Sequence, residues 1–223
     1  ARDLHLVVPV LPFMSGALQE LRQGTIITLM DRFADLRAPS WAAWRVLLKA
    51  AFALPLDEVE LARFRRFTGR ETAPTRRARE IWSIVGRRGG KSRIMALLAV
   101  FLAACVVHKL TSGEVGLVMV LAADRKQARV VKRYISAFLK ALPSLKSLIV
   151  NETKDLIELR GDIAIEIQTA SLASVRGYTV IGAICDEIAY WPSDEKAADP
   201  DVEILAALRP GMATIPDALL LCI

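Results

Sequence analysis

Cysteine and histidine are scarce in this 223-residue chain, and their positions exclude several kinds of site. The three cysteines, Cys105, Cys185 and Cys222, are far apart and lie within apolar runs, where a thiol behaves as a small buried hydrophobe. Only two histidines, His5 and His108, accompany them, so neither a zinc-ligand spacing nor a catalytic cysteine–histidine signature is present. We therefore expect three reduced and buried thiols, which implies a reducing compartment.

The sequence also lacks a hydrophobic run long enough to cross a membrane. The longest run covers residues 94–107, between Arg93 and His108, whereas a spanning helix needs about 20 apolar residues. The apolar segment 6–14 is interrupted by two prolines and has no charged leader, unlike a cleavable signal peptide. We expect a core helix over residues 94–107 and no membrane association.

Basic residues are concentrated in one part of the chain. The composition, 53% hydrophobic and 24% charged with a net charge of +6, is that of a globular protein. Residues 61–93 hold eleven Lys or Arg and two Asp or Glu, so the rest of the chain is slightly acidic. This basic segment is either a nucleic-acid contact or a solvated, arginine-rich connector.

A glycine-rich turn between two apolar segments predicts a phosphate-binding loop. Residues 81–92, IWSIVGRRGGKS, have the pattern of a strand and a loop, and a long apolar helix pattern follows. At a helix N-terminus the unpaired backbone N–H groups of Gly89, Gly90 and Lys91 would attract a polyphosphate. Lys91 would contact the β- and γ-phosphates, and Ser92 would give its hydroxyl to Mg²⁺.

This loop deviates from the usual signature G-x-x-x-x-G-K-[ST]. Val85 stands where the first glycine is expected, and Gly86 follows one place later with Arg87 and Arg88 after it. The alternative is a chance G-G-K-S sequence in an ordinary loop.

The second half of an ATPase site is predicted at residues 180–190. The run VIGAICDEIAY reads as a buried strand that ends in two carboxylates. Asp186 would hold Mg²⁺ through its water shell, and Glu187 would act as the general base for the attacking water. A surface Asp-Glu pair in a strand-to-loop turn is the alternative, and the matching phosphate loop argues against it.

Two helices are expected before the phosphate loop. Ser40 could cap the first, which Pro55 would stop, and Asp57 could open the second, which ends near Gly69. We expect residues 1–70 to form an N-terminal extension and helical adaptor, and residues 71–223 to form the ATPase core. Trp41 or Trp44 could stack on an adenine, although a place in the core is the commoner role for tryptophan.

The remaining segments alternate between strand and helix patterns. Strands are expected at 116–122 and 218–223, a hairpin at 156–169, a short helix at 201–208 and a turn at 209–211. A helix capped by Asp124 carries a basic face that either follows a phosphate backbone or is merely solvated, formed by Arg125, Lys126, Arg129, Lys132 and Arg133. This order predicts an α/β fold with a mostly parallel sheet flanked by helices, and the two motifs together predict a P-loop NTPase of the ASCE type.

Residues 38–223 resemble the large terminase subunit of tailed bacteriophages, the motor that packages DNA. The resemblance rests on the loop at 86–92, on SLASVRGY at 171–178, on the carboxylate strand and on ALRPGMATIPDALLL at 207–221. Terminase phosphate loops commonly read G-R-R-x-G-K-[ST] and lack the first glycine, as this loop does. The family's coupling motif and nuclease domain fall beyond residue 223, so we expect no nuclease activity here.

The resemblance implies roles for individual residues. Lys91 and Ser92 match the phosphate lysine and the Mg²⁺ hydroxyl residue, while Asp186 and Glu187 match the metal aspartate and the catalytic glutamate. Arg87 matches an arginine that senses the γ-phosphate, and Arg176 matches one proposed to reach a neighbouring subunit's ATP. The other residues of the nucleotide-binding loop are Gly86, Arg88, Gly89 and Gly90.

The family further implies a biological setting. It predicts an Mg²⁺-dependent ATPase that forms a homo-oligomeric ring and drives double-stranded viral DNA into a procapsid. Its partners would be the portal protein and the small terminase subunit, and its place the cytoplasm of the host bacterium. A helicase-type ATPase and a binding module with a vestigial ATP site are the alternatives.

Overall fold

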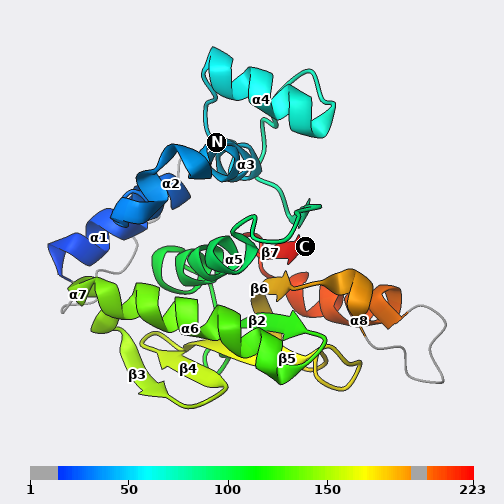
Figure 1. Cartoon of the computed structure of the whole chain (residues 1–223). Coiled ribbons are helices and arrows are strands. Elements are labelled where there is room, and N and C mark those ends of the chain that lie inside the picture. The colour runs from blue at the N-terminus through cyan, green and yellow to red at the C-terminus, as the bar shows by residue number, and fades with distance from the viewer. Residues whose placement is uncertain (1–14, 192–199) are drawn as a thin grey trace, which may run out of the picture.

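A computed structural model describes residues 15–191 and 200–223, and a seven-stranded sheet forms its centre (Figure 1). The strand order is β1-β7-β6-β2-β5-β4-β3. The first five strands of this order run parallel, and β4 and β3 continue the sheet antiparallel. The strands are β1 (Glu80–Trp82), β2 (Gly116–Ala122), β3 (Ile149–Glu152), β4 (Leu156–Leu159), β5 (Ile163–Thr169), β6 (Thr179–Cys185) and β7 (Leu219–Cys222).

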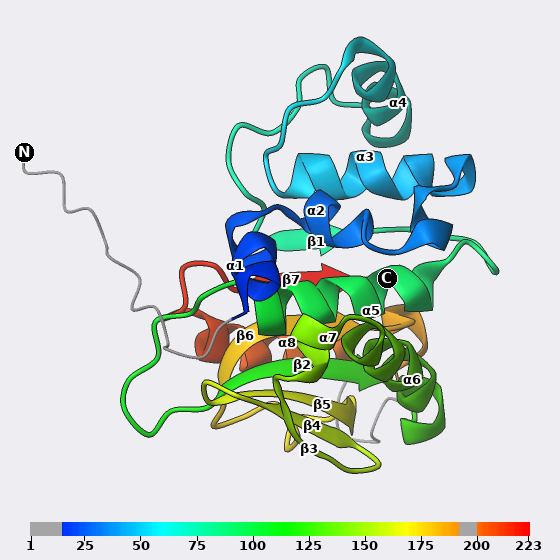
Figure 2. The ribbon, with the colours of Figure 1, turned by 90° about the vertical axis from the view of Figure 1, so that its left-hand side faces the viewer.

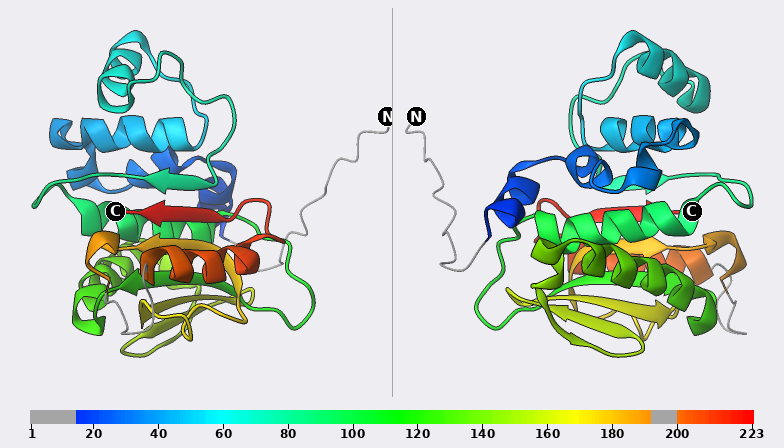
Figure 3. Two further views of the ribbon diagram at one scale, coloured as in Figure 1. Left: turned by 90° about the vertical axis from the view of Figure 1, so that its right-hand side faces the viewer. Right: turned by 60° about the vertical axis from the view of Figure 1, so that its left-hand side comes forward.

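Helices cover both faces of this sheet. On one face lie α1 (Gly16–Gln23), α5 (Lys91–Val100), α6 (Arg125–Ala141) and α7 (Pro143–Lys146), whereas α8 (Pro200–Met212) covers the other (Figures 2 and 3). All seven residues of β2 are buried, as expected for a strand covered on both faces. The predicted α/β class with a mostly parallel sheet is therefore confirmed.

The strand order positions the two predicted motifs. The phosphate loop follows β1, and the carboxylates follow β6. A single strand, β7, lies between β1 and β6 and pairs with both in parallel. Because all three strands run parallel, the carboxyl ends of β1 and β6 lie at the same edge of the sheet.

The N-terminal helices lie on the β1 side of the molecule, and the last of them stands away from α5 (Figures 1 and 2). They are α2 (Ile26–Met30), α3 (Ala42–Ala51) and α4 (Glu58–Thr68), with short 3-10 turns at Ala34–Arg37 and Pro39–Trp41. Asp57 caps α4 with a reciprocal capping box and Gly69 ends it at φ 67°, as predicted. The predicted Ser40 cap is wrong, because Ser40 lies within the turn Pro39–Trp41 and α3 begins without a side-chain cap.

Two further elements differ from expectation. The core helix predicted over 94–107 is α5, and it continues as a π-helical turn, Phe101–Cys105, before the chain becomes extended. The turn predicted at 209–211 is wrong, because α8 runs through Pro210 to Met212. A Cβ at Gly211 would lie 2.6 Å from the Tyr178 carbonyl oxygen, so α8 packs here closely against the segment that precedes β6.

The predictions for the hairpin, the cysteines and membrane-spanning segments can be compared directly with the structure. Strands β4 and β5 form the expected hairpin through Gly161 and Asp162, both at positive φ, whereas β3 was not foreseen. All three cysteines are free and buried, as predicted. Among the described residues, no helix is long and apolar enough to cross a membrane.

Candidate nucleotide site

The predicted phosphate loop connects β1 to α5 and is tightly packed. Gly90 is the N-cap of α5 at φ 85°, a left-handed conformation that glycine adopts without steric cost. Arg88 also has a positive φ, 61°. Val85, which replaces the usual glycine, packs so closely that a Cβ on Gly89 would lie 2.6 Å from its Cγ1. Val85 therefore leaves no room for a side chain at position 89.

The hydrogen bonding of the loop's backbone N–H groups differs from the prediction. The Gly89 N–H donates to the Gly86 carbonyl at 3.2 Å, so the expectation that it is unpaired is wrong. Within the described residues, the Gly90 N–H has no hydrogen-bond acceptor. Gly90 and Lys91, at the start of α5, therefore provide the N–H groups available to a polyphosphate.

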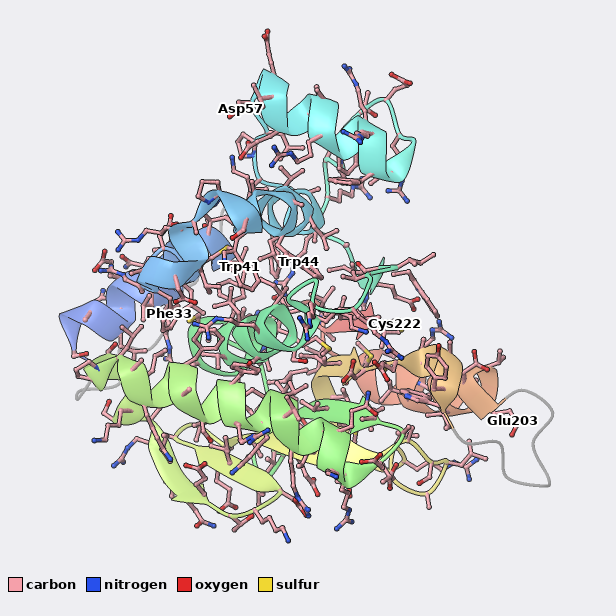
Figure 4. The ribbon with its side chains drawn as sticks, in the orientation of Figure 1. Phe33, Trp41, Trp44, Asp57, Glu203 and Cys222 are labelled. Carbon is pink, nitrogen blue, oxygen red and sulfur yellow. The ribbon has the colours of Figure 1, made fainter. Side chains whose placement is uncertain are left out.

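Two tryptophans from the N-terminal helices contact this loop, which sequence reasoning did not foresee. The Trp44 indole N–H donates to the Gly89 carbonyl oxygen at 2.7 Å. The Trp41 ring lies 2.6 Å from where a Cβ on Gly90 would be placed. Both side chains lie between α3 and α5 (Figure 4). Because Trp44 is buried, its predicted place in the core is correct, but it also supports the site.

The two predicted carboxylates lie where β6 leaves the sheet. The Asp186 N–H donates to the Leu121 carbonyl at 2.8 Å, and the residue is only 4% exposed. Glu187 turns the chain at φ 48°, a strained conformation of the kind found at functional sites, and its side chain is 40% exposed. The Trp191 indole N–H donates to the Asp186 carbonyl at 3.0 Å and holds this turn.

The fold brings both motifs together through Lys91. Its Nζ lies 3.4 Å from Oε1 of Glu187, although the two residues are 96 positions apart in the sequence. Burial raises the pKa of Asp186, and the charge of Glu187 raises it further, whereas Lys91 and a hydrogen bond from Gln127 lower it. Gln127 stands in the first turn of α6, where its N–H binds the Asp124 cap, and no sequence motif singled it out.

These residues fit an Mg²⁺ ion bound together with phosphates. Asp186 is a buried carboxylate whose pKa is raised by desolvation, so a cation beside it would stabilise its charged form. Ser92, in the first turn of α5, can supply a hydroxyl oxygen. Within residues 15–191 and 200–223, no three His, Cys, Asp or Glu side chains gather as a metal cage. Mg²⁺ usually takes one or two carboxylates and completes its shell with phosphate and water.

A cavity of about 360 Å³ adjoins the loop. Trp41, Val130 and Tyr134 form its apolar walls, and the loop forms its polar side from Arg88 to Arg93. This cavity therefore places two aromatic rings beside the predicted phosphate loop.

The two arginines expected to reach ATP are exposed and have no ion-pair partner in the described part of the chain. Arg87 lies in the phosphate loop. Arg176 lies three residues before β6, in a loop held by reciprocal hydrogen bonds between Ser171 and Ser174. Glu187 follows the other end of β6, and a seven-residue strand is about 20 Å long. The structure therefore does not bring Arg176 to the carboxylates of its own chain.

The basic face of α6 is largely engaged by acidic side chains of the β3–β4 hairpin. Arg125 and Arg129 pair with Asp155 at 3.4 and 3.0 Å. Lys132 pairs with Glu152 at 2.9 Å and is 8% exposed. Of the five basic residues considered, only Lys126 and Arg133 lack such a partner within the described residues. Most of this face therefore has a structural role.

Comparison with known proteins gives similarity at the level of the fold. No protein-family model and no curated protein sequence matches this chain. The HK97 bacteriophage large terminase is similar with a TM-score of 0.48 and 19% identity, over 81% of this chain and 37% of that one. The Thermus phage P74-26 large terminase ATPase domain is similar with a TM-score of 0.47 and 17% identity, over 79% of this chain and 68% of that one. An arginine-to-alanine mutant of that domain is similar with a TM-score of 0.45 and 16% identity, over the same shares of the two chains. This chain thus spans 37% of the HK97 protein, and it is similar in fold to phage large-terminase ATPase domains.

Proposed function

We propose that this chain is an Mg²⁺-dependent ATPase whose site lies between the phosphate loop and the end of β6. One observation carries the proposal. Lys91 and Glu187, predicted from separate motifs to act on one nucleotide, lie 3.4 Å apart beside the buried Asp186. An incidental G-G-K-S loop would have no reason to lie against an Asp-Glu strand end.

Each residue has a physical task in this proposal. The Gly90 and Lys91 N–H groups and the Lys91 ammonium bind the β- and γ-phosphates, and Arg87 adds charge at the γ-phosphate. Ser92 and Asp186 would hold Mg²⁺, which would supply positive charge to neutralise the phosphates. Glu187 orients and deprotonates the attacking water.

The Lys91 ammonium is paired with the Glu187 carboxylate. A polyphosphate carries more negative charge than one carboxylate, so we expect bound ATP to draw Lys91 away from Glu187. That exchange would leave the Glu187 carboxylate free to accept a proton only when substrate is present.

We further propose that ATP hydrolysis drives translocation of double-stranded DNA, as in a phage large terminase. The motif match over residues 38–223 and the basic segment 61–93 support this. In the same proposal the active form is a homo-oligomeric ring in the bacterial cytoplasm, acting with a portal protein and a small terminase subunit. Residues 1–70 then form the adaptor, and residues 71–223 form the ATPase core.

Arg176 is proposed to act on the ATP of the next subunit. It is exposed and lies beyond the far end of β6 from its own Glu187, whereas Arg87 lies in the loop itself. An arginine supplied to a phosphoryl-transfer site can be worth about 10³–10⁵ in rate, so an isolated subunit should hydrolyse ATP slowly.

Two substitutions test the ATPase proposal. We expect Lys91→Ala to abolish Mg·ATP binding in calorimetry, and Glu187→Gln to retain binding while hydrolysis slows by about 10²–10⁴-fold. Lys109→Ala, which removes an exposed lysine away from the loop, is the matched control. Wild-type affinity in Lys91→Ala would refute the assignment. Binding without hydrolysis in the assembled wild-type protein would indicate a vestigial site.

A further inference from the structure

The peptide unit between Gly89 and Gly90 is held from outside the loop. Its carbonyl oxygen accepts the 2.7 Å hydrogen bond from the Trp44 indole, and its N–H, at Gly90, has no acceptor in the described part of the chain. In a trans peptide the C=O and N–H bonds point in opposite directions across one plane. The bond to Trp44 therefore aims the Gly90 N–H away from α3.

This peptide needs an external constraint because glycine flanks it on both sides. Glycine occupies positive and negative φ with similar ease, so a peptide plane between two glycines can rotate at little steric cost. In the rotated state the carbonyl oxygen would replace the N–H and repel a phosphate. The hydrogen bond from the Gly89 N–H to the Gly86 carbonyl belongs to the preceding peptide and does not itself select between the two states.

Trp44 is well placed to select the state of this peptide in which the N–H, and not the carbonyl oxygen, would face a phosphate. The residue is 7% exposed and lies on the buried face of α3 together with Leu48 and Ala51, so its position is set by the core. The Trp41 ring packs against the Cα of Gly90 and limits movement on that side of the loop. A buried donor thus binds a carbonyl whose flanking glycines would allow the peptide to rotate.

We propose that Trp44 is a positioning residue for phosphate binding, which fixes the Gly89–Gly90 peptide so that the Gly90 N–H faces the polyphosphate. The proposal rests on the ATP-binding function argued above. It assigns Trp44 an effect on phosphates rather than on the base, and it makes the N-terminal helices part of the nucleotide site.

The test compares two ligands in three variants of the full chain. Trp44→Phe keeps most of the ring volume and removes the donor. Because one hydrogen bond contributes a net factor of about 2–12 to an equilibrium, we expect Mg·ATP and pyrophosphate each to bind about 3- to 10-fold more weakly in calorimetry. Trp82→Phe is the matched control, because the Trp82 indole N–H contacts Glu80 and not the loop.

A second substitution separates the hydrogen bond from packing. Trp44→benzothienylalanine keeps the two-ring shape and replaces the N–H by sulfur, so it should weaken both ligands as Trp44→Phe does while thermal stability is retained. Unchanged affinity in this variant would overturn the proposal.

The pattern across ligands distinguishes the remaining outcomes. Weaker binding of ATP alone, with pyrophosphate unaffected, would mean that Trp44 contacts the base and would also overturn the proposal. Failure of the wild-type protein to bind either ligand would instead refute the ATPase function itself.

Discussion

The carboxylate of Glu152 predicts a specific loss of stability in acid. It accepts hydrogen bonds from Lys132 at 2.9 Å, from Lys140 at 2.7 Å and from the Ser136 hydroxyl, and so fastens the β3–β4 hairpin to α6. Burial alone would raise the pKa of Glu152, but these donors outweigh it and hold the pKa at about 2, against an ordinary value of 4.5. A group with a lowered pKa stabilises the fold above its unfolded pKa, and that contribution is lost as the pH falls towards the folded value.

The shift sets the size of the effect. A difference from 4.5 to about 2 corresponds to at most about 3 kcal/mol, and we expect about 1–2 kcal/mol after solvent screening, because Lys140 is 53% exposed. Glu152→Gln should therefore be less stable than wild type by this amount at pH 6, and the difference should shrink below pH 4.5 and largely vanish only near pH 2. Urea unfolding followed by circular dichroism at pH 6, 5, 4, 3 and 2 measures the difference.

A matched substitution tests whether the effect belongs to this cluster. Glu158→Gln changes a glutamate on the neighbouring strand whose described hydrogen bond is to the neutral Asn151. It should cost little at any of these pH values. The reasoning is refuted if Glu152→Gln and wild type differ equally at pH 6 and pH 2.

Three further outcomes are expected. Burial raises the pKa of Asp186, so charging this carboxyl destabilises the fold as the pH rises above the ordinary value of 3.8. Asp186→Asn should therefore melt at a higher temperature than wild type at pH 7.5 without Mg²⁺, and this advantage should disappear below pH 3.8. The same variant should lose Mg²⁺-dependent ATP binding. Neutralising Lys126 and Arg133 together should reduce the slope of log K against log[salt] for double-stranded DNA by up to about 2, without loss of stability; an unchanged slope in anisotropy titrations would exclude this helix face. Mixing Arg176→Ala with Glu187→Gln should restore ATP hydrolysis that neither variant has alone, and mixed assemblies without activity would contradict a role across subunits.

Local patterns were sufficient for most of the secondary structure. The uninterrupted apolar run at 116–122 forms β2, and Asp57 and Asp124 cap their helices because an Asp side chain accepts the backbone N–H three residues later. The prediction of a turn at residues 209–211 failed, because the helix continues there although proline and glycine favour a break. Gly211 is packed against the Tyr178 carbonyl, and this contact, absent from any local window, accompanies a helix that continues through a proline.

In the candidate site, too, some residues could be predicted from the sequence and others could not. Lys91, Asp186 and Glu187 could be singled out because their chemistry imposes a spacing on the chain: a lysine after a glycine turn, and two carboxylates after a buried run. Trp44 contacts this region through one hydrogen bond to the Gly89 carbonyl, and Gln127 lowers the pKa of Asp186.

Such supporting residues leave no pattern in the sequence, because any element that the fold brings near can supply a single donor. Trp44 lies 45 positions before the carbonyl it binds, on a helix whose apolar spacing accounts for a core tryptophan completely. Its second role becomes visible only when α3 is seen against α5 (Figure 4). The N-terminal helices therefore do more than cover the edge of the sheet: by fixing one peptide plane of the phosphate loop, they link the packing of residues far upstream to the geometry in which a phosphate would bind.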